Sequence, residues 1–156
     1  MLSSGNKNLN QASAVNHMTK ALKGLLMVIE KENQSLKVGQ ISAIRTIIEE
    51  KVAALQAFNE AQLVVEDYVR KGGVFDREST PMVKLKSMFE SLAKLNWDNE
   101  VLIRSNLEVS SKIVEMYKDS KTQETLRQFG YNKEGKVSVA SNIDKVMPAI
   151  GLNDKV

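Results

Sequence analysis

The chain has 156 residues, of which 42% are hydrophobic, 5% aromatic and 26% charged, and its net charge is +3. This length suits a single domain with its own hydrophobic core. The chain contains no cysteine, which excludes disulfides, thiolate metal sites and a thiol nucleophile.

The first segment of the chain is small and polar. We expect residues 1–11 to be disordered. No apolar core like that of a secretory signal is present, and the apolar run Leu25 to Ile29 is far shorter than the roughly 20 residues that span a bilayer. We therefore expect a cytoplasmic protein without membrane insertion.

A first amphipathic helix is predicted from Ala12. Its apolar residues recur in steps of three and four, which places them on one helical face: Val15, Met18, Leu22, Leu25, Leu26, Ile29 and Leu36. The segment Lys37-Val38-Gly39-Gln40 predicts a break, because glycine favours the left-handed conformation that ends helices. A single glycine costs only about 1 kcal/mol inside a helix, so one continuous helix over 12–70 is the alternative.

A second helix is predicted from Ile41 to the stop at Arg70-Lys71-Gly72-Gly73. Ser79 or Thr80 then caps a third helix with Pro81 in its first position, and this helix is predicted to run to about Ser120. Two adjacent apolar stripes cover it, so it must bury both against two partners, or against one partner and a bound protein. The first stripe is Met82, Leu85, Phe89, Leu92, Ile103, Ile113 and Tyr117; the second is Leu85, Met88, Leu92, Leu95, Leu102, Val109, Ile113 and Met116.

Polar residues interrupt the stripes of the third helix. Asn96, Asn99 and Asn106, with Ser110 one turn further on, lie on or between them. A buried asparagine can determine the register of a helical assembly, or these residues can mark a solvent gap in the seam. Together these patterns predict an all-α fold: an antiparallel three-helix bundle or hairpin of long amphipathic helices over residues 12–129, with flexible termini. The tail over residues 130–156 is predicted to be mostly flexible.

No group of residues in the sequence has the composition of a catalytic or metal site. His17 is the single histidine and has no carboxylate nearby in the sequence. The acidic and basic residues alternate, as in Glu30-Lys31-Glu32 and Glu49-Glu50-Lys51, which is typical of solvated helix faces. We therefore expect no enzymatic activity, no metal, no cofactor and no nucleic-acid partner, and we expect the chain to act by binding protein.

Three motifs, in order, resemble the FlgN-type flagellar export chaperones. Leu36-x-x-Gly39-Gln40-Ile41, followed by Ile48-x-Glu50-Lys51-x-x-x-Leu55, is similar to the helix break and the "EK…L" pattern of that family. Leu95-Asn96-x-x-Asn99-x-x-Leu102-Ile103, Asn106-Leu107 and Ile113-x-Glu115-Met116 resemble its client-binding helix. Tyr131-x-x-x-Gly135 is similar to its "YGxxG" element, with Asn132 in place of the usual glycine.

The resemblance implies a cytoplasmic chaperone that works without ATP. Such a protein binds the C-terminal amphipathic helices of hook–filament junction (hook-associated) proteins and brings them to the type III export gate. The implied client-binding residues are Leu102, Asn106, Val109, Ser110, Ile113, Met116 and Tyr117, and the implied export-gate contact is Tyr131. The alternative is a structural coiled-coil or bundle subunit of a protein assembly.

Overall fold

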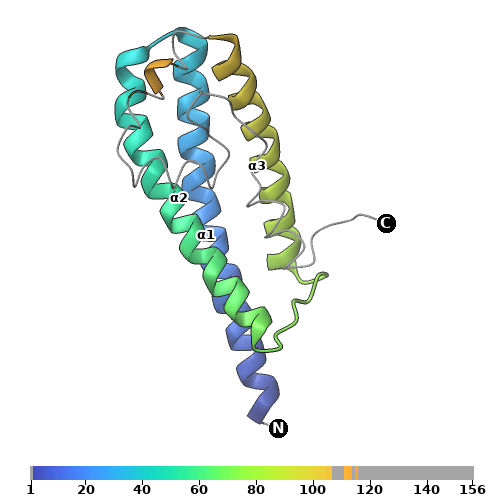
Figure 1. Ribbon diagram of the computed structural model, residues 1–156. Coiled ribbons are helices and arrows are strands. Elements are labelled where there is room, and N and C mark those ends of the chain that lie inside the picture. Colours follow the sequence, from blue (N-terminus) through green and yellow to red (C-terminus); the bar gives the residue numbers. More distant parts are fainter. Residues whose placement is uncertain (1, 107–110, 114, 116–156) are drawn as a thin grey trace.

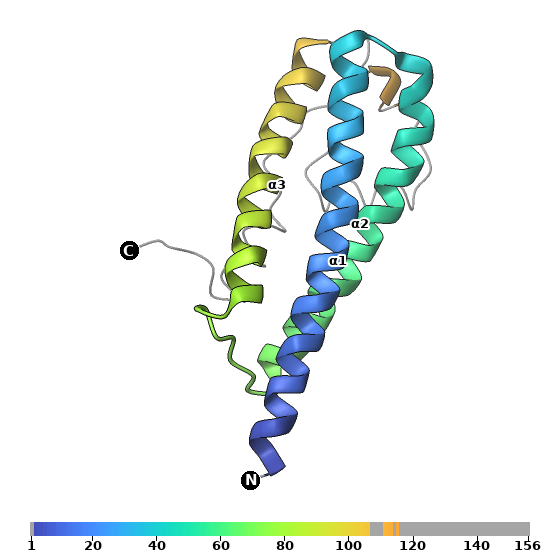
Figure 2. The same cartoon turned by 180° about the vertical axis from the view of Figure 1, so that it is seen from behind.

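The described part of the chain is a bundle of three long helices. The computed structural model describes residues 2–106, 111–113 and 115, and for residues 2–10 it describes the backbone alone. The helices are α1 (Leu2–Val38), α2 (Ile41–Arg70) and α3 (Thr80–Ser105). α1 lies in the middle and packs against both others; α2 runs antiparallel to α1, and α3 runs parallel to it (Figures 1 and 2). The predicted all-α bundle is thus confirmed.

Both predicted breaks after the first and second helices are present. Gly39 separates α1 from α2 with a φ of +70°, and the Gln40 N–H donates to the Ser35 carbonyl at 3.0 Å. Gly72 follows α2 with a φ of +85°. Such positive φ values are open to glycine at little steric cost, whereas a Cβ crowds the backbone there. The continuous-helix alternative for residues 12–70 is therefore wrong.

The start of α1 and the end of α3 differ from the sequence-based expectation. α1 begins at Leu2, within the segment that was expected to be disordered. α3 ends at Ser105, and Asn106 leaves the helix with φ −127° and ψ 74°, so the predicted continuous helix to about Ser120 is wrong at this point. Serine and asparagine side chains compete for backbone hydrogen bonds, which favours a helix end at Ser105-Asn106.

A short helical turn follows after the gap in the described residues. Residues 111–113 are helical and lie beside the ends of α1 and α2 that the Gly39 turn connects (Figures 1 and 2). Ile113 is 2% exposed and belongs to the core. This residue therefore packs in the bundle, not in line with α3.

The apolar stripes meet in one core. Phe58 on α2 and Phe89 on α3 contact each other edge to face, with ring centroids 6.4 Å apart. The first predicted stripe of the third helix is buried from Met82 to Ile103, and Met88, Leu95 and Leu102 of the second stripe are half-buried against it. The core also contains Val15, Met18, Leu22, Leu25, Ile29, Leu36, Ile44, Ile48, Leu55 and Val65.

Two glycine substitutions are predicted to change stability in opposite directions. Gly39→Ala should lower the free energy of unfolding by about 1 kcal/mol, because alanine is strained at this φ. Gly24→Ala is the matched control: Gly24 is helical and exposed, with no atom within 4 Å of an added Cβ. It should raise the free energy of unfolding by up to about 1 kcal/mol. Urea unfolding followed by circular dichroism measures both, and equal effects would contradict the assignment of the break.

Candidate functional site

A layer of polar side chains crosses the interior of the bundle. We call this the polar layer: Glu32 and Asn33 on α1, Lys51 on α2 and Asn99 on α3, between 0% and 4% exposed. Lys51 Nζ lies 2.7 Å from Glu32 Oε2 and donates to Asn99 Oδ1 at 3.5 Å. Asn99 Nδ2 donates to Asn33 Oδ1 at 2.9 Å, and Asn33 Nδ2 donates to the Leu95 carbonyl at 3.2 Å. These contacts connect all three helices.

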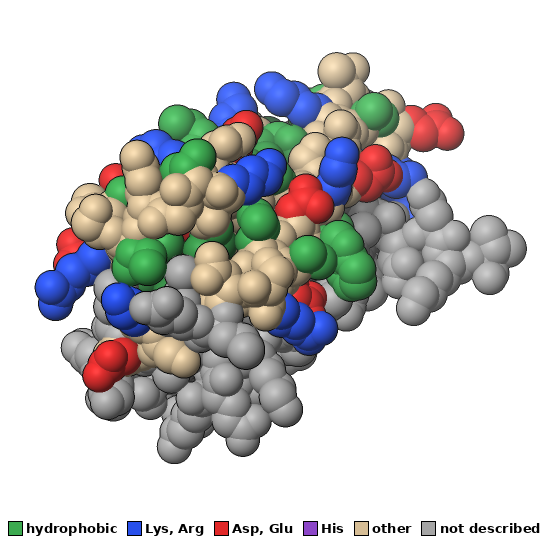
Figure 3. Space-filling view, turned by 90° about the horizontal axis from the view of Figure 1, so that it is seen from above, with side chains coloured by type: hydrophobic (Ala, Val, Ile, Leu, Met, Phe, Trp, Pro, Cys, Tyr) green, Lys and Arg blue, Asp and Glu red, His purple; other side chains and the backbone are tan. Residues whose placement is uncertain are grey.

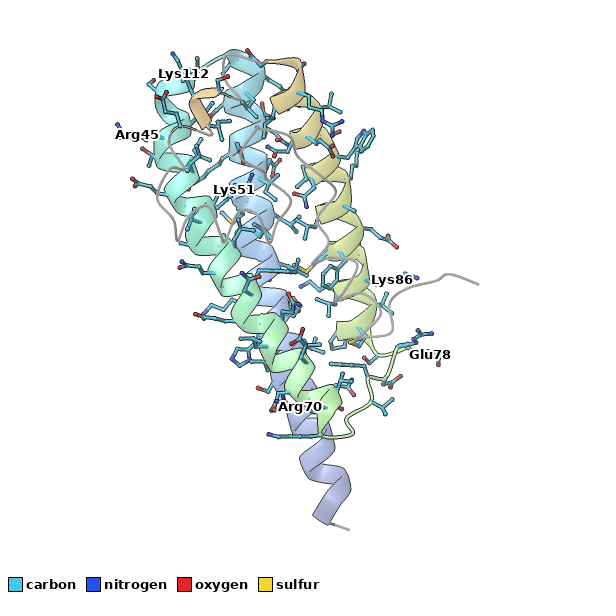
Figure 4. All side chains as sticks on the ribbon, viewed as in Figure 1. Arg45, Lys51, Arg70, Glu78, Lys86 and Lys112 are labelled. Atoms are coloured by element: carbon cyan, nitrogen blue, oxygen red, sulfur yellow. The ribbon has the colours of Figure 1, made fainter. Side chains whose placement is uncertain are left out.

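The charges of the polar layer are removed from water. Figure 4 shows Lys51 reaching inward between the helices, whereas Arg45 on the same helix points outward. Burial lowers the pKa of Lys51, and the Glu32 carboxylate acts in the opposite direction. Glu32 Oε1 has no hydrogen-bond partner among the residues that the structure describes. A buried pair of this kind contributes little net stability, although loss of one partner is strongly destabilising.

Sequence reasoning missed the polar layer. It interpreted Glu32 and Lys51 as parts of solvated charge runs, and the structure shows that this interpretation is wrong for both residues. A signal was available in the spacing, because Glu32 lies three residues after Ile29 and four before Leu36, on the apolar face. Lys51 follows the buried Ile48 in the same way on α2.

The asparagines of α3 have different environments. Asn99 lies in the polar layer and is hydrogen-bonded, which favours the register interpretation for this residue. Asn96 is half-buried, and its Nδ2 has no partner within the described residues. Asn106 is half-buried at the C-cap of α3. Only one of the three is therefore built into an interior network.

The end of α3 also has an apolar surface directed away from the core. Trp97 is 57% exposed and Val101, one turn further along, is 48% exposed. We call these two residues the outer patch. On the inner side of the same turns, Asn99 and Glu100 are buried. The amphipathic pattern of α3 is therefore partly inverted here, with polar side chains inside and apolar ones outside.

The structure describes three of the eight residues that the resemblance implies as binding residues. Leu102 packs half-buried against the core, Asn106 is half-buried, and Ile113 is buried. Leu102 directly follows Val101 of the outer patch in the sequence, whereas Ile113 belongs to the helical segment 111–113, which lies beside α1 and α2 (Figure 1). The others lie outside the described residues: Val109, Ser110, Met116, Tyr117 and Tyr131.

Among the remaining features, one groove lies between α1 and α2. It encloses about 460 Å³ and its lining includes Ala21, Gly24, Ala54, Ala57 and Ala61. His17 also lines it, and its Nδ1 is 2.8 Å from the Ser13 carbonyl oxygen. Over the described ranges, no group of three or more metal-ligating side chains is found.

The surface charges of the bundle do not indicate a particular ligand. On the face shown in Figure 3, basic and acidic side chains are interspersed. None of the helices, over the described residues, is long and apolar enough to cross a membrane. The fold and site define a three-helix protein with an interior polar layer and an apolar patch at the end of α3. No protein-family model, curated protein or solved structure matches the chain.

The lowered pKa of Lys51 predicts a pH-dependent contribution to stability. Between the lowered folded-state pKa and the ordinary lysine value of about 10.4, the unfolded chain binds more protons at this residue than the folded chain. Stability should therefore rise with pH in this window, by at most about 1.4 kcal/mol per pH unit for one proton. The reference is the variant Glu32→Leu/Lys51→Met, which lacks both charges.

Urea unfolding of both proteins between pH 8 and pH 10.5 tests this prediction. The free energy of unfolding of the wild type, minus that of the variant, should increase with pH. A difference that stayed constant or decreased would show that burial does not lower this pKa.

Proposed function

We propose that this chain is a cytoplasmic flagellar export chaperone of the FlgN type. In this proposal it binds the C-terminal amphipathic helices of hook–filament junction proteins and brings them to the type III export gate. It needs neither a cofactor nor a nucleic acid. The proposal rests on the sequence motifs, and the all-α architecture with an apolar surface at the end of α3 supports it.

The outer patch is the structural observation that best supports the proposal. Trp97 and Val101 lie at the entry to the segment from Leu102 to Tyr117, for which the resemblance implies client binding. An amphipathic helix binds through apolar residues spaced by three or four positions, and i, i+4 spacing on a receiving helix offers a matching ridge. Tryptophan is enriched among the residues that dominate binding energy. An exposed tryptophan beside the implied site therefore suits a helix-binding role.

The alternative function, a structural bundle subunit, has one observation in its favour. The groove between α1 and α2 is lined by Ala21, Gly24, Ala54, Ala57 and Ala61 together with His17, Lys20, Glu60 and Val64, and its small residues allow close approach of another helix. The two functions differ in their partner: a terminal helix of another protein for the chaperone, and a permanent assembly for the subunit. A chain that sedimented as a stable oligomer and bound no client helix would favour the subunit.

The outer patch is predicted to contribute to client binding. The variant Val101→Asp should weaken binding of a synthetic peptide, with the sequence of the C-terminal helix of a hook–filament junction protein, by about tenfold or more. The reason is that an exposed carboxylate cannot be desolvated beside an apolar helix without a large penalty. Val83→Asp is the matched control, because Val83 is 57% exposed on the same helix but lies in its first turn, at the opposite end from Val101.

Trp97 is the single tryptophan of the chain, so its fluorescence reports the binding directly. In the wild type and in Val83→Asp, its emission should shift to shorter wavelength as the peptide covers it. Equal affinity of both aspartate variants would remove the outer patch from the site. Absence of binding by the wild type would count against the chaperone function itself.

Tyr131 is predicted to act in delivery and not in holding the client. An exposed tyrosine provides a large contact area at low entropic cost, which suits an anchor for a second partner. The variant Tyr131→Ala should therefore keep its thermal stability and its affinity for the client peptide, while secretion of the client into the medium falls. A stability loss of several kcal/mol would instead indicate a packed ring. Normal secretion by a stable variant would contradict the docking role.

A further inference from the structure

The packing of α3 changes character along its length. In its first half the buried side chains are apolar, and Met82, Leu85, Phe89 and Leu92 are each 0% exposed. Beyond Leu92 the fully buried positions are Asn99, Glu100 and Ile103, so only one of them is apolar. The two halves of α3 are therefore held to the bundle by different forces.

The second half of α3 combines exchangeable polar contacts with the buried Ile103 and the half-buried Leu95 and Leu102. Asn99 bonds to Asn33 and Lys51, and the Leu95 carbonyl accepts from Asn33. Water replaces each of these hydrogen bonds when the helices separate, whereas it gives no such replacement for the contacts of Phe89. The outer patch on this half is not part of the buried core, since Trp97 is 57% and Val101 48% exposed.

When the second half of α3 separates from the bundle, the buried charges of Glu32 and Lys51 are hydrated again. Lys51 and Glu32 are 1% and 0% exposed, and both would meet water once Asn99 moved away. Glu32 Oε1, which has no hydrogen-bond partner in the described part of the chain, would gain one from solvent. The desolvation penalty of the buried pair therefore favours opening at this level of the bundle.

We propose that the polar layer is a release point, at which residues 95–105 of α3 swing away from α1 and α2 while residues 82–92 stay packed. This proposal rests on the proposed function and adds its regulation. Opening uncovers Ile103 and the apolar side chains beside it at the end of the bundle where α1 meets α2. An amphipathic client helix then covers these side chains together with the outer patch. In the closed bundle the same apolar surface is withheld from other partners.

Hydrogen exchange of the full-length chain without any client tests the release directly. The measured quantity is the ratio of amide exchange rates in residues 95–99 to those in residues 85–92. These segments lie more than a turn from the helix ends, so fraying of the last turn does not contribute. In the wild type the ratio should be about ten or more, because local opening is independent of global unfolding. A ratio near one would overturn the proposal.

An apolar replacement of the polar layer should close the release point. The variant Glu32→Leu/Asn33→Leu/Lys51→Met/Asn99→Leu removes the polar contacts and the buried charges at similar volume, and should reduce the exchange ratio by about tenfold. The single variant Asn99→Ala removes the hydrogen bonds of Asn99 with Asn33 and Lys51 and should raise the ratio by a similar factor. If the fourfold variant does not fold, the single variant decides. An unchanged ratio in either folded variant would overturn the proposal.

The affinity of the folded fourfold variant for the client peptide then distinguishes the proposed release point from the proposed chaperone function. The outer patch is intact in this variant, yet the affinity of the variant for the peptide should fall by about tenfold, because residues 95–105 separate less readily from α1 and α2. Unchanged affinity, with the exchange ratio reduced, would show that the client binds without release. In that case the effect of Val101→Asp on wild-type affinity still tests the proposed function independently.

Discussion

The ion pair between Glu32 and Lys51 constrains the arrangement of the other parts of the bundle. Neither charge is stable in the core alone, so α1 and α2 must meet with Lys51 Nζ at 2.7 Å from Glu32 Oε2. A shift of α2 by one turn along α1 would leave both charges opposite apolar side chains. The pair therefore selects one register of the hairpin. The apolar stripes alone define this register poorly, because they repeat every three or four residues.

The same pair determines how α3 can join the hairpin. Its buried charges need polar neighbours, and Asn99 and Asn33 provide them between α3 and α1. The apolar stripe of α3 is interrupted at this level for that reason, and the interruption separates a firmly packed first half from a polar second half. The exposed Trp97 and Val101 then lie on the half whose inner contacts are exchangeable. Under the proposed release, the specificity of register and the separation of the end of α3 have one common cause.

This combination suits a protein that holds a helix temporarily. A permanent assembly gains from a continuous apolar seam, whereas a temporary holder needs an apolar surface that is available on demand and otherwise covered. Under the proposed function, the outer patch provides initial contact and the apolar end of the bundle provides the rest. Neither role requires a catalytic group, an ion or a nucleotide, and the binding energy comes from apolar surface removed from water.

The features that the sequence determined by itself are local. Helical periodicity, Gly39 and Gly72 as stops and the start of α3 at Ser79-Thr80-Pro81 depend on residues within a few positions of one another. The three helices and their order were therefore predictable, although the sequence left the N-cap open between Ser79 and Thr80. The end of α3 was predicted wrongly, at about Ser120 and not at Ser105, because serine and asparagine disfavour a helix interior only weakly and do not forbid one.

Tertiary structure alone decided which polar residues are inside. Lys51 is 19 positions from Glu32 and 48 positions from Asn99, and no local rule states that their faces meet. Adjacent opposite charges in the sequence favoured solvated helix faces, although the spacing of Glu32 and Lys51 within the apolar stripes contradicted that interpretation. Likewise, the exposure of Trp97 depends on how α3 packs against the rest of the bundle. Burial depends on how three helices pack around a shared interior, and that arrangement is a property of the whole chain.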